Sequence, residues 1–274
     1  MVAALKLAFI HVNYNNSLLT IDCVRSILTN CNQADIIIVD NDSNQSEKDL
    51  LVNYIDSQNT NQIKCIFENR NLGYFGALNV GIGQIINSAN EYDFVIIGNN
   101  DLEFQADFFD RLSKIKVQDD IFVLAPNIIK PNGIHQNPYC IDRVSKTRKF
   151  LYRIIYSSYS VAQFVFWLTN ILKVAKSEMS RSGHEVSQYI YAGHGSCYIL
   201  TSGFFKYNKL LVNLTFLMGE EFVLANQVKN THGKIYYDAD LRVLHNEHSS
   251  MGKIPSKKVY EFNRNAYNIV KNYF

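Results

Sequence analysis

Amide and acidic side chains follow an apolar run in the first half of the sequence. The run DFVIIG (93–98) is followed directly by Asn99, Asn100 and Asp101. A β-turn capped by short polar side chains would explain these residues as structure alone. Carboxylate and carbonyl oxygens are also the ligands that Mg²⁺ and Mn²⁺ prefer. Because a bound diphosphate can supply the remaining oxygens, one carboxylate suffices, and Asp101 is a candidate metal ligand.

Two further acidic residues and two histidines lie late in the sequence. Glu220 and Glu221 follow Gly219, where a helix is predicted to start. They can be explained as acids that favour a helix N-terminus, or as the source of a general base. His245 and His248 flank the dipeptide Asn-Glu, and a neutral imidazole can ligate a metal. For either histidine alone, a solvated or hydrogen-bonded side chain is the simpler interpretation.

The β-branched run DIIIVD (35–40) ends in an aspartate. Asn41, Asp42 and Ser43 after it are typical of a turn and a helix N-cap. Asp40 itself belongs to the end of the predicted strand. At that position a carboxylate can accept hydrogen bonds from a nucleotide base or a ribose, so Asp40 is a candidate binding residue.

The segment ENRNLGYFGALNVGI (68–82) is rich in glycine. It has neither the GxGxxG spacing of a dinucleotide-binding turn nor the Gly-Lys-Ser/Thr of a Walker loop. Glycine within a helix costs about 1 kcal/mol relative to alanine, so several together indicate a close approach of backbone or ligand. Helix N-termini attract phosphate, which makes Arg70 and the backbone amides near Gly73 candidates for binding a diphosphate.

The elements that must position these residues alternate between strand and helix in the first half. Strands are predicted at 5–12, 35–40, 62–68, 93–98 and 121–126, and helices at 18–31, 46–57, 73–89 and 105–117. Such alternation with short connections predicts an α/β fold, in which helices cover both faces of a mostly parallel sheet. Ligands of these sheets bind beyond the carboxyl ends of the strands, where the polar residues described above are expected to meet.

The second half has a less regular pattern. It predicts a turn at 130–133, a strand over 189–200, a helix over 219–230, irregular β-structure over 234–245 and a C-terminal helix over 256–271. The net charge of the 274 residues is only +2, which gives no reason to expect nucleic acid as a partner. Five scattered cysteines indicate free thiols in a reducing compartment. The N-terminus lacks the basic start and cleavage site of a signal peptide, so a first strand and a cytoplasmic location are expected.

The segment 150–173 differs from the rest of the sequence. Arg153 is its only charge before Lys173, and basic residues precede and follow it. Its length approaches that of a membrane span, although several polar residues interrupt it. Three interpretations stay open: contact with a membrane interface, a helix buried in the core or in a homodimer interface, and a membrane span.

Taken in order, the motifs resemble those of the inverting glycosyltransferases of family 2, which have the GT-A fold. The closest resemblance is to the rhamnosyltransferase-like group that builds bacterial surface polysaccharides. The matching motifs are HVNYNN, IVDNDS, NLGYFGALNVGI, GNND, YAGHGSCYIL, MGEE and LHNEHSS. They cover nearly the whole chain except about residues 140–188. Each motif is weak alone, but their order is specific.

The resemblance implies a nucleotide-sugar donor linked to dTDP, UDP or GDP, a divalent metal (Mn²⁺ or Mg²⁺) and inversion at the anomeric carbon. Glu221 matches the position of the base that deprotonates the acceptor, and Glu220 is the next candidate. Asp101 and His245 match metal-site positions, with His248 as the fallback for the histidine. The residues that the resemblance places in the donor site are Asn13, Asp40, Asn69, Arg70, Gly73, Asn79 and Asn100.

Two positions depart from the family pattern. Asn99 and Asn100 stand where a more acidic or proline-containing motif is usual, so the metal site has less negative charge and weaker metal binding is expected without the donor. Glu221 stands where aspartate is usual, and its longer side chain changes the geometry of the base.

The resemblance also implies one GT-A domain with a nucleotide-sugar-binding half (1–126) and an acceptor-side half (127–255). An apolar insertion lies near 143–176, and a C-terminal helix (256–274) follows. The expected activity is that of a hexosyl- or deoxyhexosyltransferase at the inner face of the plasma membrane, which extends a lipid-linked glycan of an O-antigen or capsule. The alternatives are a catalytically degenerate protein that binds nucleotide sugar, and a sugar nucleotidyltransferase. A sugar nucleotidyltransferase usually has a glycine-rich loop near its first strand, and this sequence has no such loop there.

Overall fold

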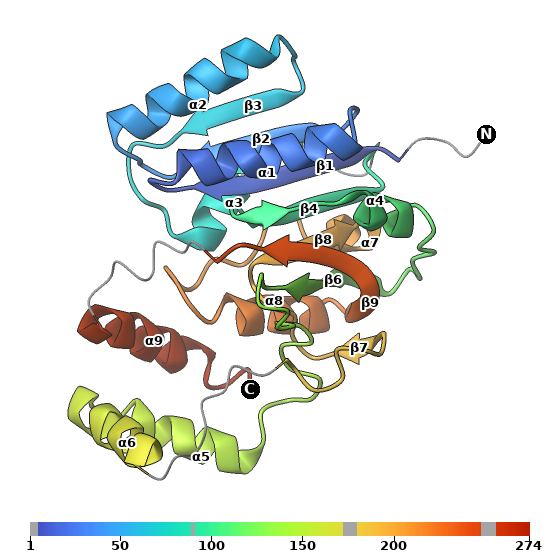
Figure 1. The fold of residues 1–274 in the computed structure, drawn as a ribbon. Coiled ribbons are helices and arrows are strands. Elements are labelled where there is room, and N and C mark those ends of the chain that lie inside the picture. Colours follow the sequence, from blue (N-terminus) through green and yellow to red (C-terminus); the bar gives the residue numbers. More distant parts are fainter. Residues whose placement is uncertain (1–4, 89–90, 172–179, 248–255) are drawn as a thin grey trace.

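The computed structural model describes residues 5–88, 91–171, 180–247 and 256–274 (Figure 1). Its first half contains the predicted alternation. The elements are β1 (Leu7–Asn13), α1 (Ser17–Asn30), β2 (Asp35–Asp40), α2 (Gln45–Gln58), β3 (Ile63–Phe67), α3 (Tyr74–Ile85) and β4 (Phe94–Asn99). The strands pair in parallel in the order β3-β2-β1-β4. Their carboxyl ends therefore share one edge of the sheet, as the sequence predicted.

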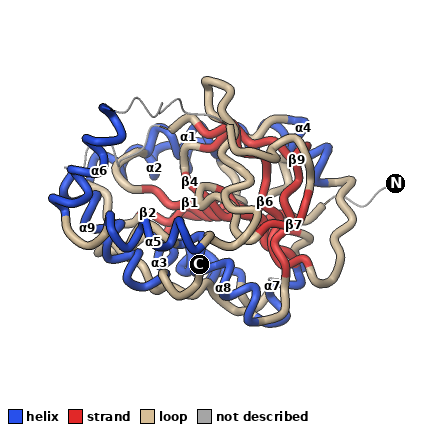
Figure 2. Tube along the Cα trace, turned by 90° about the horizontal axis from the view of Figure 1, so that it is seen from below, coloured by secondary structure: helices blue, strands red, loops and turns tan. Residues whose placement is uncertain are grey.

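The parallel strands are apolar on both faces because each face is covered. Ile10, Ile37 and Ile97 pack on the face covered by α3, whereas Phe9 and Ile36 pack on the face covered by α1 and α2. Figure 2 shows the strands in the middle of the molecule with helices on either side. Alternate residues of one strand enter opposite cores, which is why the strand sequences are continuous apolar runs.

The second half extends the same sheet with strands of mixed direction. Its elements are β5 (Leu102–Glu103), α4 (Ala106–Leu112), β6 (Ile121–Ile129), β7 (Gln188–Ile190), β8 (Cys197–Thr201), α7 (Ser202–Tyr207), α8 (Glu220–Asn230) and β9 (Lys234–His245). Strand β8 lies antiparallel between β4 and β6, and β9 pairs in parallel with β6. The sheet as described therefore stays mostly parallel, with the order β3-β2-β1-β4-β8-β6-β9-β5, and β7 pairs with β9.

The strand predicted over 189–200 is wrong in its middle. Residues 191–196 form a loop between β7 and β8, and the two strands pair with different neighbours, β9 and β4. The apolar and aromatic residues on both sides of the loop made it appear continuous in the sequence. This loop reaches the candidate site described below.

Three helices lie together at one end of the molecule, at the bottom left of Figure 1. They are α5 (Lys146–Ile155), α6 (Tyr159–Ile171) and α9 (Ser256–Val270). The described part of the apolar segment, residues 150–171, is thus divided between two helices. Phe150 and Phe164 are 64% and 60% exposed, so the interpretation of this segment as a helix buried in the chain's own core is wrong. Among the described helices, none combines the length and apolar character needed to cross a membrane.

Candidate active site

A short strand pair places Asp101 beside His245. Leu102, the first residue of β5, pairs with His245 at the end of β9, and the amide of Asn246 donates to the carbonyl of Asp101 at 2.9 Å. Oδ1 of Asp101 consequently lies 3.2 Å from Nε2 of His245. Both side chains are buried, with exposed fractions of only 5%. The sheet thus brings together two candidate metal ligands that are 144 positions apart in the sequence.

Gln136 holds the imidazole of His245 in one orientation. Nδ1 of His245 lies 2.6 Å from Oε1 of Gln136, while Nε2 of Gln136 donates to Glu247 at 2.9 Å. An amide oxygen can only accept, so Nδ1 of His245 carries the proton. Glu247 is itself ion-paired with Lys130 at 2.8 Å. The chain Lys130–Glu247–Gln136 therefore directs Nε2 of His245 toward Asp101.

The carboxylate of Asp101 stays negatively charged despite its burial. Burial by itself raises the pKa of Asp101, but the imidazole of His245 only 3.2 Å away outweighs it and holds this pKa below its usual value. A second imidazole, that of His194, has its ring centre 6.2 Å from that of His245. Burial and His245 together lower the pKa of His194 to about 3, so His194 is neutral at physiological pH.

This arrangement fits the divalent metal that the motif pattern suggests. Oδ1 of Asp101 makes no well-directed hydrogen bond to any described residue, although it is buried. With Nδ1 of His245 held by Gln136, Nε2 is the ring nitrogen that would face a metal beside this oxygen. Adjacent ligands of an octahedral ion with bonds of about 2.1 Å are separated by about 3 Å, close to the observed 3.2 Å. No cluster of three acidic, histidine or cysteine ligands occurs in the described ranges, so further ligands would have to come from diphosphate and water.

Asn13 is the centre of a buried network behind this pair. Its Nδ2 donates to Oδ2 of Asp40 at 2.8 Å, and its Oδ1 accepts from Thr20 at 2.7 Å and Asn100 at 3.2 Å. The other carboxylate oxygen of Asp40 accepts from the backbone amide of Ser43. Asn13 and Asp40 have no exposed surface. They fix the ends of β1 and β2 and the turn before Asp101, and their direct contact with a nucleotide stays a prediction.

The turn before α3 supplies the open side of the predicted donor site. Asn69 and Arg70 are exposed. Gly73 has φ +75°, and a Cβ there would lie 2.3 Å from the carbonyl oxygen of Phe216, so only glycine fits. Asn79 has a different task, because its amide exchanges two 2.8 Å hydrogen bonds with the backbone of Leu211. It holds the loop before α8 onto α3, and its assignment to the nucleotide site has no support from the structure.

The first turn of α8 carries the acidic pair. Burial and the charge of Glu221 raise the pKa of Glu220 to about 8, and burial also raises the pKa of Glu221. Backbone amides at Glu221 and Gly195, together with Arg181, partly offset this rise for Glu221. Oε1 of Glu220 is buried without a hydrogen-bond partner among the described residues. The pair therefore holds a proton near neutral pH, with Glu221 the member better stabilised as a carboxylate.

The loop Gly193–Ser196 joins the two clusters. Its Ser196 carbonyl accepts from the amide of Asn99, two residues before Asp101, at 2.9 Å. A Cβ at Gly195 would lie 3.1 Å from Oε1 of Glu221, so the glycine packs directly on the candidate base. The Gly195 carbonyl also accepts from the hydroxyl of Tyr74 at 2.8 Å. One loop thus contacts the metal-site turn, the candidate base and the start of α3.

Several residues of this site were not found by sequence reasoning. Gln136 lies outside the matching motifs, whereas His194 and Gly195 lie within YAGHGSCYIL and Tyr74 within NLGYFGALNVGI, where nothing singled them out as site residues. Only the fold brings them to the site. His248, the fallback metal ligand, lies outside the described residues.

Comparison with known proteins identifies the family. The model of glycosyl transferase family 2 matches residues 9–169, which is more than half of the chain. The chain belongs to this family of sugar-transferring enzymes. No curated protein matches the sequence.

Solved structures share the fold at low sequence identity. A mannosyltransferase from Pyrobaculum calidifontis in complex with GDP-Man and Mn²⁺ superposes with a TM-score of 0.55 at 12% identity, over 88% of this chain and 56% of that one. GalNAc-T7 with UDP, GalNAc and Mn²⁺ superposes with a TM-score of 0.56 at 18% identity, over 92% of this chain and 45% of that one. TarS 1-349 from S. aureus in complex with UDP-GlcNAc superposes with a TM-score of 0.52 at 14% identity, over 91% of this chain and 61% of that one. These likenesses show a GT-A fold, and the chain spans only about half of each relative's length.

Proposed function

We propose that this protein is a metal-dependent inverting glycosyltransferase that moves a sugar from a nucleotide-sugar donor to an acceptor hydroxyl. The observation that carries the proposal is that the loop Gly193–Ser196 contacts two clusters whose pKa values are shifted in opposite directions. Asp101 and His245 form the cluster suited to a cation, and Glu220 and Glu221 form the cluster suited to a proton. Membership of the family and neighbours solved with nucleotide sugars and Mn²⁺ support the same assignment.

Glu221 acts as the general base in this proposal. A carboxylate whose pKa is raised by burial accepts the proton of an acceptor hydroxyl more readily than a solvated one at neutral pH. Backbone amides and Arg181 keep Glu221 ionised in preference to Glu220. Attack from the face opposite the leaving group needs only one such carboxylate, which is consistent with inversion.

Asp101 and His245 would hold the divalent ion, with Gln136 fixing the imidazole. When bound, the ion neutralises the charge that develops on the leaving diphosphate. The amides of Leu72, Gly73 and Tyr74 already donate to Asn41, Asn71 and Phe216. In this turn the exposed Arg70 is therefore the group that would meet the diphosphate. The loop Gly193–Ser196 packs on Glu221 and accepts hydrogen bonds from Asn99 and Tyr74. It would therefore hold Glu221 in a fixed position relative to the donor.

The finer parts of the proposal rest on the motif resemblance. We propose a lipid-linked glycan of an O-antigen or capsule as the acceptor, a hexose or deoxyhexose as the transferred sugar, and a rhamnosyltransferase-like subtype. The reaction would take place at the inner face of the plasma membrane. The donor nucleotide is UDP, GDP or dTDP.

A donor screen tests the proposal. The full chain is incubated with UDP-, GDP- and dTDP-sugars in the presence of Mn²⁺ or of EDTA, and free nucleoside diphosphate is measured. We expect slow release with one donor in Mn²⁺ and none in EDTA, and NMR of a transfer product should show an inverted anomeric centre. Binding of a donor without any release or transfer, with a range of acceptors, would favour a degenerate binding protein. If no donor is bound, the proposal is wrong.

A further inference from the structure

Helix α5 presents a row of apolar side chains on the side that faces away from the protein. Phe150, Leu151 and Ile154 are 64%, 44% and 37% exposed. At 100° per residue these three side chains share one face of the helix, which we call the outer face of α5. Monomeric proteins seldom expose apolar residues in such groups without a partner.

The opposite side of α5 is already fixed to α9 and the C-terminal residues. The ring of Tyr152 lies 5.7 Å from that of Phe274, and the ring of Tyr156 stacks on Tyr267 at 4.9 Å. Nζ of Lys149 donates to the backbone carbonyl of Phe274 at 2.8 Å. Because α5 is held in this way, the outer face cannot turn inward to join the core.

Positive charges border the outer face on both sides. Lys146 and Arg153 lie along one border and Arg148 along the other, and all three are exposed. Residues 143–171 contain no aspartate or glutamate. An apolar stripe flanked by cations along a helix is typical of helices that lie in the interface of an anionic bilayer.

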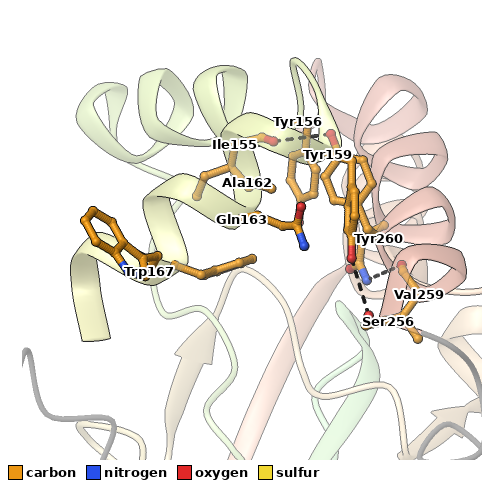
Figure 3. Close-up of a pocket in the computed structure, with 11 residues that line it drawn as sticks. Ile155, Tyr156, Tyr159, Ala162, Gln163, Trp167, Ser256, Val259 and Tyr260 are labelled. Carbon is orange, nitrogen blue, oxygen red and sulfur yellow. Dashed lines mark hydrogen bonds between the residues drawn. The ribbon is translucent and has the colours of Figure 1, made fainter. Parts of the chain in front are cut away.

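Helix α6 adds aromatic side chains beside α5. The rings of Phe164 and Trp167 stack at 5.8 Å and are 60% and 56% exposed. A cavity of about 590 Å³ continues this apolar surface between α6 and α9, with Trp167 on its α6 side and Tyr260 on its α9 side (Figure 3). Aromatic side chains of this kind favour the boundary between water and lipid.

We propose that the outer face of α5, together with Phe164 and Trp167, binds the surface of an anionic phospholipid bilayer. Charge complementarity favours the bilayer over a second copy of the chain, since a two-fold contact through this face would bring the cations of both copies together. The absence of a spanning helix among the described residues agrees with a helix that lies on the surface. The proposal concerns a surface outside the candidate active site, and it stands whether or not the proposed sugar transfer is correct.

Vesicle co-sedimentation of the full chain, without any nucleotide sugar, tests this proposal. We expect binding to phosphatidylcholine vesicles prepared with about 30% phosphatidylglycerol, and weaker binding to vesicles of pure phosphatidylcholine. Phe150→Ala combined with Leu151→Ala should lower the partition coefficient by about tenfold, because the apolar anchor is lost. Lys146→Gln combined with Arg153→Gln should lower it by about fivefold per cation at low salt, and by less at high salt.

A matched control is available on another helix. Leu50 of α2 is 40% exposed, close to the exposure of Leu151, and Leu50→Ala should leave vesicle binding unchanged. Circular dichroism and thermal melting of each variant show whether the fold is kept. Equal binding of the Phe150/Leu151 double variant and the wild type would overturn the proposal. So would a wild-type protein that does not bind anionic vesicles and forms a dimer that the double variant dissociates.

Discussion

The two acidic clusters of the candidate site differ in the direction of their pKa shifts, although both are buried. Asp101 has an imidazole beside it, and its pKa is held low. Glu220 has another carboxylate beside it, and its pKa is raised to about 8. Burial acts on both groups in the same direction, so the neighbouring side chain decides the outcome. One cluster is thereby suited to a permanent charge that binds a cation, and the other to the transfer of a proton.

The largest effect is expected when the permanent charge is removed. Asp101→Asn keeps the shape of the side chain but not its charge, and we expect Mn²⁺-dependent donor turnover to fall by about 10³-fold, on the scale of losing a preorganised electrostatic group. Calorimetry should show the loss of Mn²⁺-dependent nucleotide binding as well. Asp110→Asn, at an exposed position on α4, is the control and should retain both. If Asp101→Asn still bound nucleotide in a Mn²⁺-dependent way, the assignment of Asp101 as the metal-binding carboxylate would be wrong.

Removal of the proton acceptor should have a different signature. Glu221→Gln should lower transfer by about 10²-fold or more, because a positioned base contributes on this scale. Mn²⁺-dependent nucleotide binding should be preserved, since the metal-site side chains are untouched. Glu261→Gln, exposed on α9, is the matched control. If transfer survives in Glu221→Gln and is lost in Glu220→Gln, the base is Glu220.

Gln136→Leu tests how the metal side is oriented. The substitution removes the acceptor for Nδ1 of His245, so the imidazole is free to rotate or change tautomer. We expect the Mn²⁺ concentration for half-maximal nucleotide binding to rise by about tenfold, with little change in the maximum. The exposed Gln105→Leu serves as the control. An unchanged Mn²⁺ requirement would mean that the fold alone positions His245.

The smallest expected effect is on the pH dependence of stability, and it arises from the raised pKa of Glu220. The pKa of Glu220 is about 8 in the folded protein and ordinarily 4.5. Between these values the folded state binds a proton that the unfolded state has released, so stability falls as the pH rises from about 4.5 to 8. Glu220→Gln removes this dependence, and its melting temperature should fall less than that of the wild type between pH 5 and pH 8. If the melting temperatures of the variant and the wild type changed equally with pH across this range, the raised pKa of Glu220 would be contradicted.

The order of elements in the first half could be predicted from the sequence because it depends on local patterns. The apolar runs of β1, β2 and β4 and the polar residues after them indicate parallel strands whose carboxyl ends share an edge. This was enough to nominate Asp101, whereas His245 and Glu221 were nominated through the family resemblance of the later motifs. It was not enough to assign Asn79, since the partner of that amide is the distant backbone of Leu211.

The tertiary structure alone decided how the nominated residues meet. The sequence contains no sign that β8 runs antiparallel between β4 and β6, or that β5 pairs with the end of β9. Those long-range pairings place His245 at Asp101 and bring Gly195 onto Glu221. The sequence by itself determined which chemical groups are present and which strands carry them. Proton affinity and exposure depend on neighbours in space, so only the fold could separate a metal-binding carboxylate from a proton-binding one, and an outward-facing apolar helix from a buried one.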